Sequence, residues 1–149
     1  MRKTAPIGVF DSGLGGLTVF KTLARRMPEE SLVYFGDTAH VPYGSKSPEA
    51  VTRYSVAVAR FLAAKGIKLL VVACNTSSAV ALPAIRRAVE VPVVGVIEPG
   101  ARAALSVTHG GRIGVIGTEA TMSSGAYPRA LGALGARVKT VSQACPLFV

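Results

Sequence analysis

Short runs of apolar, mainly β-branched residues recur along this chain and alternate with longer segments of helical spacing. The runs are 7–10, 32–35, 69–73, 93–97, 113–116 and 138–141. Their length and lack of polar alternation predict buried parallel strands. Between them, apolar residues return at intervals of three and four, as in 17–24, 51–62 and 80–89. This alternation predicts an α/β fold with a doubly wound, mainly parallel sheet.

Composition places the chain among globular proteins. Half of its 149 residues are apolar and 17% are charged, a balance that supports a packed core and argues against disorder. The longest uninterrupted apolar run, 69–74, is far shorter than the roughly 18 residues that a membrane-spanning helix needs. Residues 1–10 lack the apolar region and cleavage site of a secretory signal. We therefore expect a cytoplasmic protein with no membrane partner.

The positive charge is spread over the chain. Lys and Arg outnumber Asp and Glu by 17 to 8, a formal net charge of +9. These cations stand singly or in pairs such as Arg25 and Arg26, with no basic run and no nucleic-acid-binding motif. We therefore expect a solvated basic surface and no nucleic acid partner. The alternative is a diffuse patch that attracts anionic metabolites.

An internal echo suggests two related lobes. Ile-Gly-Val at 7–9 returns at 113–115, and both strands lead into a turn with a hydroxyl side chain. We predict a first α/β lobe at 1–98 and the beginning of a second at 99–149, with two strands and one helix after Ile113. Ligands of doubly wound sheets bind beyond the carboxyl ends of the strands. Any chemistry is therefore expected in the loops that follow the strands.

The loop after the first predicted strand has residues suited to ligand binding. Asp11 and Ser12 precede a glycine-rich turn at 13–16, but the third glycine of a dinucleotide fingerprint and the Gly-Lys-Ser/Thr of a P-loop are missing. The backbone amides here can hold a carboxylate, and Ser12 can donate a hydrogen bond. Asp11 can accept a hydrogen bond from an ammonium or orient a catalytic group. The alternative is a plain helix cap formed by Asp11 or Ser12.

A second loop, 36–44, is long and rich in polar and turn residues. Loops of this kind often cover binding sites. Tyr43 and Gly44 can present an aromatic ring and a close backbone amide to a ligand. For His40 we expect an ordinary loop position rather than the role of a base.

A cysteine stands where the third predicted strand, 69–73, meets a helix. Cys74 is followed by Asn75 and Thr76, which supply hydrogen-bond donors, and a helix N-terminus favours a thiolate over a thiol. The alternative is that Cys74 is a small buried residue that continues the strand. Cys145 lies in a loop without hydroxyl partners, and we expect it only to pack. The two cysteines have neither the spacing of a zinc site nor that of a disulfide framework, so no metal is expected.

Taken together, the three loops resemble the motifs of bacterial glutamate racemases. The matching segments are FDSGLGGLTV at 10–19, YFGDTAHVPYG at 34–44 and VVACNTSSA at 71–79. Two later segments, GTEAT at 117–121 and ACPLFV at 144–149, also fit. The resemblance therefore covers essentially the whole chain.

The resemblance implies an isomerase that interconverts L- and D-glutamate without a cofactor, and therefore without pyridoxal phosphate. In this family one thiolate removes the α-proton of glutamate, a thiol on the opposite face returns a proton, and D-glutamate enters peptidoglycan precursors for cell wall biogenesis. Cys74 matches the cysteine that supplies the first of these thiols. Asp11 matches a position that contacts the substrate and assists that cysteine. The positions that match the other substrate-binding residues of the family are Ser12, Tyr43, Gly44, Asn75, Thr76, Thr118 and Thr121.

The second catalytic cysteine of the family belongs to a Cys-Thr-His segment that has no match here, and Cys145 does not correspond to it. The resemblance therefore implies a chain that is truncated relative to the family and carries one of two proton shuttles. We expect these 149 residues alone not to racemise glutamate at a useful rate. The full-length protein is expected to be a homodimer.

Two other functions stay open. One is racemisation of aspartate or another amino acid, although related aspartate and hydantoin racemases lack this combination around Asp37, Pro42 and Tyr43. The other is a non-catalytic module that binds an anionic metabolite at the same helix termini. The variant Cys74→Ser distinguishes the racemase from the binder, and a substrate screen distinguishes the racemases. Nothing in these residues specifies a role as an inhibitor of another protein.

Overall fold

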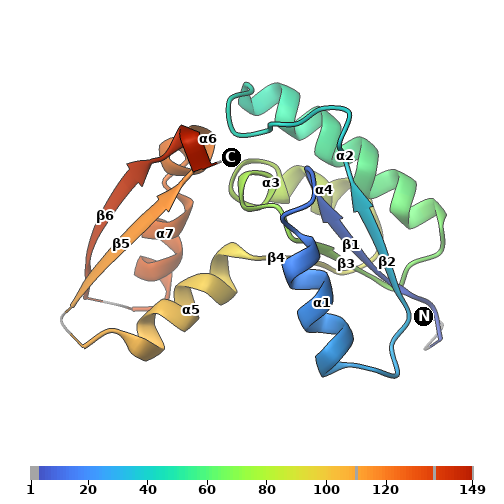
Figure 1. Ribbon diagram of the computed structural model, residues 1–149, viewed down its shortest axis with the longest axis horizontal. Helices are drawn as coiled ribbons and strands as arrows, with labels where there is room; N and C mark the ends of the chain where they lie inside the picture. The colour runs from blue at the N-terminus through green and yellow to red at the C-terminus, as the bar shows by residue number, and fades with distance from the viewer. Residues whose placement is uncertain (1–3, 110, 136, 149) are drawn as a thin grey trace.

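The structure is a computed structural model that describes residues 4–109, 111–135 and 137–148. Strands and helices alternate along the chain (Figure 1). The elements in chain order are β1 (Ile7–Asp11), α1 (Leu17–Arg26), β2 (Leu32–Gly36), α2 (Pro48–Ala64), β3 (Leu69–Val72), α3 (Asn75–Val80), α4 (Leu82–Ala88), β4 (Val93–Gly95), α5 (Ile97–Val107), β5 (Arg112–Gly117), α6 (Glu119–Ser123), α7 (Ala126–Ala133), β6 (Lys139–Ala144) and the 3-10 turn η1 (Pro146–Phe148). The predicted α/β fold is confirmed.

The strands form two parallel sheets. The larger sheet has the order β2-β1-β3-β4, and β1 is paired on both edges, with Ile7 opposite Leu32 on one side and Leu69 on the other. The smaller sheet consists of β5 and β6, with Ile113 opposite Thr140. We call the larger sheet with α1 to α4 the first lobe, and β5 and β6 with α5 to α7 the second lobe (Figure 1).

The two lobes meet at α3, which lies against α6 and α7. Both strands of the smaller sheet follow residue 98, and α5 spans that position. The division of the chain at residue 98 stays a prediction. Within the described ranges, no helix is long and apolar enough to cross a membrane.

Several predicted elements have different limits in the structure. The predicted strand 93–97 is too long, because β4 ends at Gly95 and Ile97 already begins α5. The predicted helix 80–89 is divided between α3 and α4. Pro83 lies in the first turn of α4 and has no N–H with which to continue the ladder of α3.

The last part of the chain also departs from the prediction. It contains two short helices after β5 where one helix was expected, because Gly125, between α6 and α7, has a left-handed φ of 63°. The predicted strand 138–141 begins one residue later, at Lys139, and runs on to Ala144.

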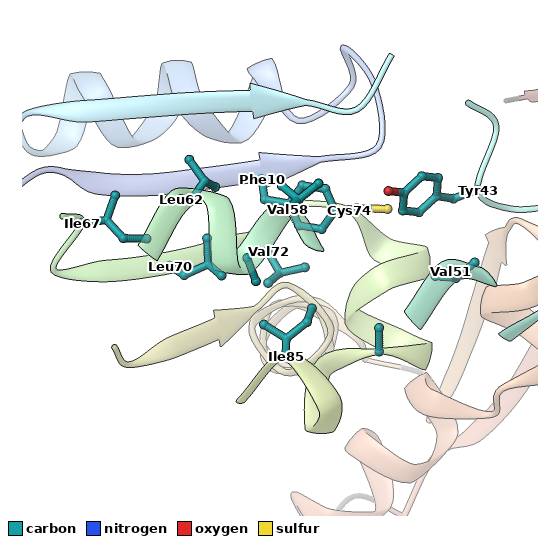
Figure 2. Close-up of a cluster of buried hydrophobic side chains, with 12 residues drawn as sticks. Phe10, Tyr43, Val51, Val58, Leu62, Ile67, Leu70, Val72, Cys74 and Ile85 are labelled. Carbon is teal, nitrogen blue, oxygen red and sulfur yellow. The ribbon is translucent and has the colours of Figure 1, made fainter. Parts of the chain in front are cut away.

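The main core lies between the larger sheet and the helices α2, α3 and α4. It consists of the buried residues Phe10, Tyr43, Val51, Val58, Ala59, Leu62, Ile67, Leu70, Val72, Cys74, Ala81 and Ile85 (Figure 2). On the opposite face of the sheet, a smaller cluster that includes Val9 and Val71 packs against side chains of α1. Cys74 and Tyr43 lie together at one end of the main core, far from Ile67 (Figure 2). The packed sheet therefore supports both side chains at its edge.

Three helices begin at side chains that satisfy free backbone N–H groups. The acceptors are Ser47 Oγ for α2, Cys74 Sγ for α3 and Thr118 Oγ1 for α6. Such N-terminal caps fix where the helix starts. Two of these caps, Cys74 and Thr118, belong to the site described next.

Candidate active site

A cleft of about 710 Å³ lies at the carboxyl ends of β1 and β3, the edge at which doubly wound sheets bind ligands. The loop after β1, the end of the loop after β2, the start of α3 and one residue after β5 form its walls. Its size suits a small metabolite. The cleft is lined by every predicted site residue except Thr121, namely Asp11, Ser12, Tyr43, Gly44, Cys74, Asn75, Thr76 and Thr118.

Cys74 combines a buried position with polar contacts at its sulfur. Only 5% of the residue is exposed, and it packs in the main core. Its Sγ accepts a hydrogen bond from the backbone N–H of Ser77 at 3.4 Å and lies 3.5 Å from Ser12 Oγ. Cys74 is therefore buried, as one alternative expected, but it caps α3 and does not continue β3, which ends at Val72. Its sulfur faces the serine of the first loop.

The carboxylate of Asp11 organises the loop after β1. Its Oδ2 accepts hydrogen bonds from the backbone N–H groups of Gly13 and Gly16, each at 3.0 Å. These two amides, expected to be free for the carboxylate of a ligand, are thus already occupied by Asp11. Among the described residues, no hydrogen bond reaches Oδ1, so that oxygen is open to a ligand.

Tyr34 supports the loop after β1, a role that the sequence did not reveal. Its hydroxyl donates a hydrogen bond to Gly13 O at 2.7 Å and lies 3.5 Å from Asp11 Oδ2. Burial, reinforced by the negative charge of Asp11, raises the pKa of Tyr34 to about 12. The apolar run at 32–35 identifies Tyr34 as a strand residue, but only the parallel register with β1 brings its hydroxyl to the loop.

Tyr43 lines the cleft, and its hydroxyl is bound by Asp37. The hydroxyl donates a hydrogen bond to Asp37 Oδ2 at 2.6 Å, and burial together with Asp37 raises the pKa of Tyr43. His40 Nδ1 lies 2.8 and 2.9 Å from the two carboxylate oxygens of Asp37, and the His40 ring stacks on Tyr54. His40 does not line the cleft, in agreement with the ordinary loop position expected for it.

Three threonine hydroxyls join the two lobes at the cleft. Thr76 Oγ1 lies 2.8 Å from Thr118 Oγ1 and 3.3 Å from Thr121 Oγ1, and the last two atoms are 2.8 Å apart. Gly44 packs so closely on Thr118 that a Cβ there would stand 2.4 Å from Thr118 Cβ. Thr121 thus supports the two lining threonines without reaching the cleft itself.

The side chain of Asn75 is also held from the second lobe. The hydroxyl of Tyr127, in α7, donates a hydrogen bond to Asn75 Oδ1 at 2.6 Å. No motif in the sequence connects these residues, since the contact depends on how the lobes pack.

Similarity to known proteins identifies the family of this chain. The family model described as Asp/Glu/Hydantoin racemase matches residues 7–146. The chain belongs to this family. A glutamate racemase from Geobacter metallireducens is 60% identical over 96% of this chain and 53% of its own length. A glutamate racemase from Aquifex aeolicus is 56% identical over 96% of this chain and 56% of its length. The chain thus spans about half the length of these relatives.

Solved structures of racemases resemble the fold closely. A glutamate racemase isoform from Bacillus anthracis superposes with a TM-score of 0.94 at 48% identity, over 99% of this chain and 55% of that one. The Francisella tularensis glutamate racemase in complex with D-glutamate gives a TM-score of 0.90 at 38% identity, over 97% of this chain and 54% of its own. The resemblance stated from the sequence motifs is therefore confirmed, both in family and in fold.

Among the described residues that line the cleft, Asp11 is the one anionic side chain, and none is a Lys or Arg. The donors that these lining residues offer to a carboxylate are therefore neutral. Cys145, by contrast, does not line the cleft, and its Sγ lies 3.8 Å from Gln143 O. Within the described part of the chain, no three His, Cys, Asp or Glu side chains gather as a metal site.

Proposed function

We propose that the cleft is half of the active site of a cytoplasmic glutamate racemase and that Cys74 is its proton shuttle on one face of the substrate. The position of the Cys74 sulfur carries this proposal. It lies at the edge of the core, next to Ser12 and in contact with a backbone N–H of α3. A thiolate there gains a hydrogen bond and the favourable field of the helix start.

The rest of the cleft suits an amino acid with two carboxylates. The open Oδ1 of Asp11 can accept a hydrogen bond from the substrate ammonium. The amide of Asn75 and the hydroxyls of Ser12, Thr76 and Thr118 can donate to carboxylates. The relative from Francisella tularensis was solved with D-glutamate, which favours glutamate over aspartate as the substrate.

The proton transfer follows from this arrangement. The Cys74 thiolate takes the α-proton, so that an S–H bond forms and a C–H bond breaks. The electron pair stays on the substrate and spreads into the α-carboxylate, where hydrogen-bond donors stabilise it. A thiol on the opposite face then returns a proton and inverts the centre. Because Cys145 does not line the cleft, we place that second thiol outside these 149 residues.

The biological role follows from the family. D-Glutamate formed in this way would supply peptidoglycan precursors, and the active enzyme would be a homodimer that needs no cofactor.

Exchange of the α-proton with solvent tests the role of Cys74. In deuterated water, we expect the 149-residue chain to exchange the α-proton of one glutamate enantiomer without inversion, as followed by proton NMR and chiral chromatography. Cys74→Ser should abolish the exchange, whereas Cys145→Ser should leave it unchanged.

Other outcomes would contradict the proposal. Racemisation by the isolated chain at a rate typical of enzymes would show that no second thiol is missing. Exchange that persists in Cys74→Ser would exclude Cys74 as the shuttle. A non-catalytic binder would hold glutamate equally well with and without the Cys74 thiol and would exchange no proton.

A further inference from the structure

Tyr127 is a residue of the second lobe whose hydroxyl reaches into the first. It lies in α7, and its hydroxyl donates to Oδ1 of Asn75, the first residue of α3, at 2.6 Å. Asn75 directly follows Cys74 and lines the same cleft. This hydrogen bond therefore connects the second lobe to the residue next to the sulfur.

The contact decides which end of the Asn75 amide faces a ligand. A primary amide has an oxygen that accepts and a nitrogen that donates two hydrogen bonds. Because Tyr127 donates to the oxygen, the Asn75 nitrogen is left as the group that can bind a ligand. A nitrogen donor is what a carboxylate needs in a cleft whose described lining has no Lys or Arg.

The ring of Tyr127 is held in place by its own surroundings. It packs over Gly100 of α5, where a Cβ would stand 3.4 Å from both the ring and the hydroxyl oxygen. Burial raises the pKa of Tyr127, so the hydroxyl stays protonated and remains a donor at neutral pH.

We propose that Tyr127 is a positioning residue that fixes the Asn75 amide with its nitrogen toward a carboxylate of the substrate. Substrate affinity then depends on the second lobe being docked against α3. The inference rests on the proposed function, since it requires glutamate in the cleft, and it adds a residue outside the three loops that resemble the family's motifs.

The test uses the alkylation of Cys74 in a Cys145→Ser background, where Cys74 is the only thiol. The rate with iodoacetamide alone reports the thiol itself. Protection by increasing L- or D-glutamate reports the Kd of the ligand. We expect Tyr127→Phe to keep the unprotected rate within about twofold and to raise the Kd about tenfold, the usual effect of weakening one hydrogen bond to a charged group.

A double-mutant cycle separates positioning from a general loss of structure. Asn75→Ala should weaken protection, and Tyr127→Phe should add nothing in that background. Asn75→Asp keeps an acceptor for Tyr127 but replaces the donor with an anionic oxygen, so it should lose protection more severely than Asn75→Ala. Tyr54→Phe is the matched control, because the Tyr54 hydroxyl accepts a hydrogen bond from Arg53 and Tyr54 does not line the cleft. It should change neither quantity.

The outcomes distinguish this inference from the proposed function. If glutamate does not protect Cys74 in the parent chain, the proposed function fails and the inference fails with it. If glutamate protects the parent and Tyr127→Phe equally well, only the inference fails. An equal loss from Tyr127→Phe with and without Asn75 would also overturn it, because the tyrosine would then act independently of the amide.

Discussion

The strands β1 and β5 share the residues Ile-Gly-Val and the same place at the start of a parallel pair, yet they differ in burial. All five residues of β1 are buried, whereas β5 alternates between exposed and half-buried residues. β1 has a partner strand on each edge, while β5 pairs only with β6 in the described part of the chain. The comparison indicates that burial of such a strand depends on its neighbours, because the shared Ile-Gly-Val is buried in β1 but not in β5.

The two pairs nevertheless end in the same way. In the first lobe, the N–H of Asp37, just after β2, donates to Asp11 O at 2.9 Å. In the second lobe, the N–H of Cys145, just after β6, donates to Gly117 O at 2.8 Å. The internal echo is thus also structural. Cys74 and Asp11, the side chains that we propose act on the substrate, nevertheless belong to the lobe that has the larger buried core.

The largest difference between the lobes should appear when a core side chain is truncated. Leu62 is fully buried in α2, whereas Ile116 in β5 is 64% exposed. We expect Leu62→Ala to lower the free energy of unfolding by about 3 kcal/mol and Ile116→Ala to lower it by less than about 1 kcal/mol. Urea denaturation followed by circular dichroism measures both. Similar losses would mean that the smaller sheet is packed as firmly as the larger one.

A second test uses the glycines at matching places in the two strands. A Cβ on Gly8 would stand 2.8 Å from Ile67 Cδ1, whereas a Cβ on Gly114 has no described atom within 4 Å. Neither glycine has a positive φ, so only packing distinguishes them. We expect Gly8→Ala to cost about 1 to 2 kcal/mol and Gly114→Ala to be neutral or to stabilise by up to about 1 kcal/mol.

Thermal unfolding of the two glycine variants gives the sign directly. Opposite shifts of Tm would show that β1 is closely packed at Gly8 and that β5 is not closely packed at Gly114. A stabilised Gly8→Ala would show that Ile67 moves aside without loss, and that β1 is less tightly packed than its burial indicates.

The fold was largely accessible from the sequence because apolar runs and helical spacing are local signals. All six strands lie where such runs occur. Two of the errors arose where one residue overrides the pattern, as Pro83 does between α3 and α4 and Gly125 does between α6 and α7. Such breaks need the backbone conformation, which periodicity does not contain.

The candidate site was accessible for a similar reason, since polar residues that follow strands share one edge of a parallel sheet. That rule brought Asp11, Ser12 and Cys74 together. The rule could not predict the contact of the Tyr34 hydroxyl, which depends on the register between β1 and β2. Nor could it predict the contact of the Tyr127 hydroxyl, which depends on how the two lobes pack. It also could not choose between ligand binding and the capping alternative for Asp11, whose carboxylate occupies two amides of its own loop.

The smallest expected effect is a difference between Tyr34 and Tyr127 in how each changes the free energy of unfolding at alkaline pH. The ordinary pKa of a tyrosine is 10.0, and in the folded chain the pKa of Tyr34 is raised to about 12, chiefly by burial and then by Asp11. Above pH 10.0 the unfolded chain loses this proton first, so the free energy of unfolding falls as the pH rises toward 12 and is fully retained below 10.0.

Tyr34→Phe removes this contribution, so its stability should fall less steeply than that of the parent chain between about pH 10 and pH 12. Tyr127→Phe should change the slope less, because only burial raises the pKa of Tyr127 and no anionic neighbour adds to it. The raised pKa of Tyr43 also makes stability fall at alkaline pH, but Tyr43 is present in all three proteins. The differences in slope between these proteins therefore report Tyr34 and Tyr127 alone. Urea denaturation at a series of alkaline pH values measures the slopes. Equal slopes for the parent and Tyr34→Phe would mean that neither burial nor the charge of Asp11 raises the pKa of Tyr34 in the folded chain.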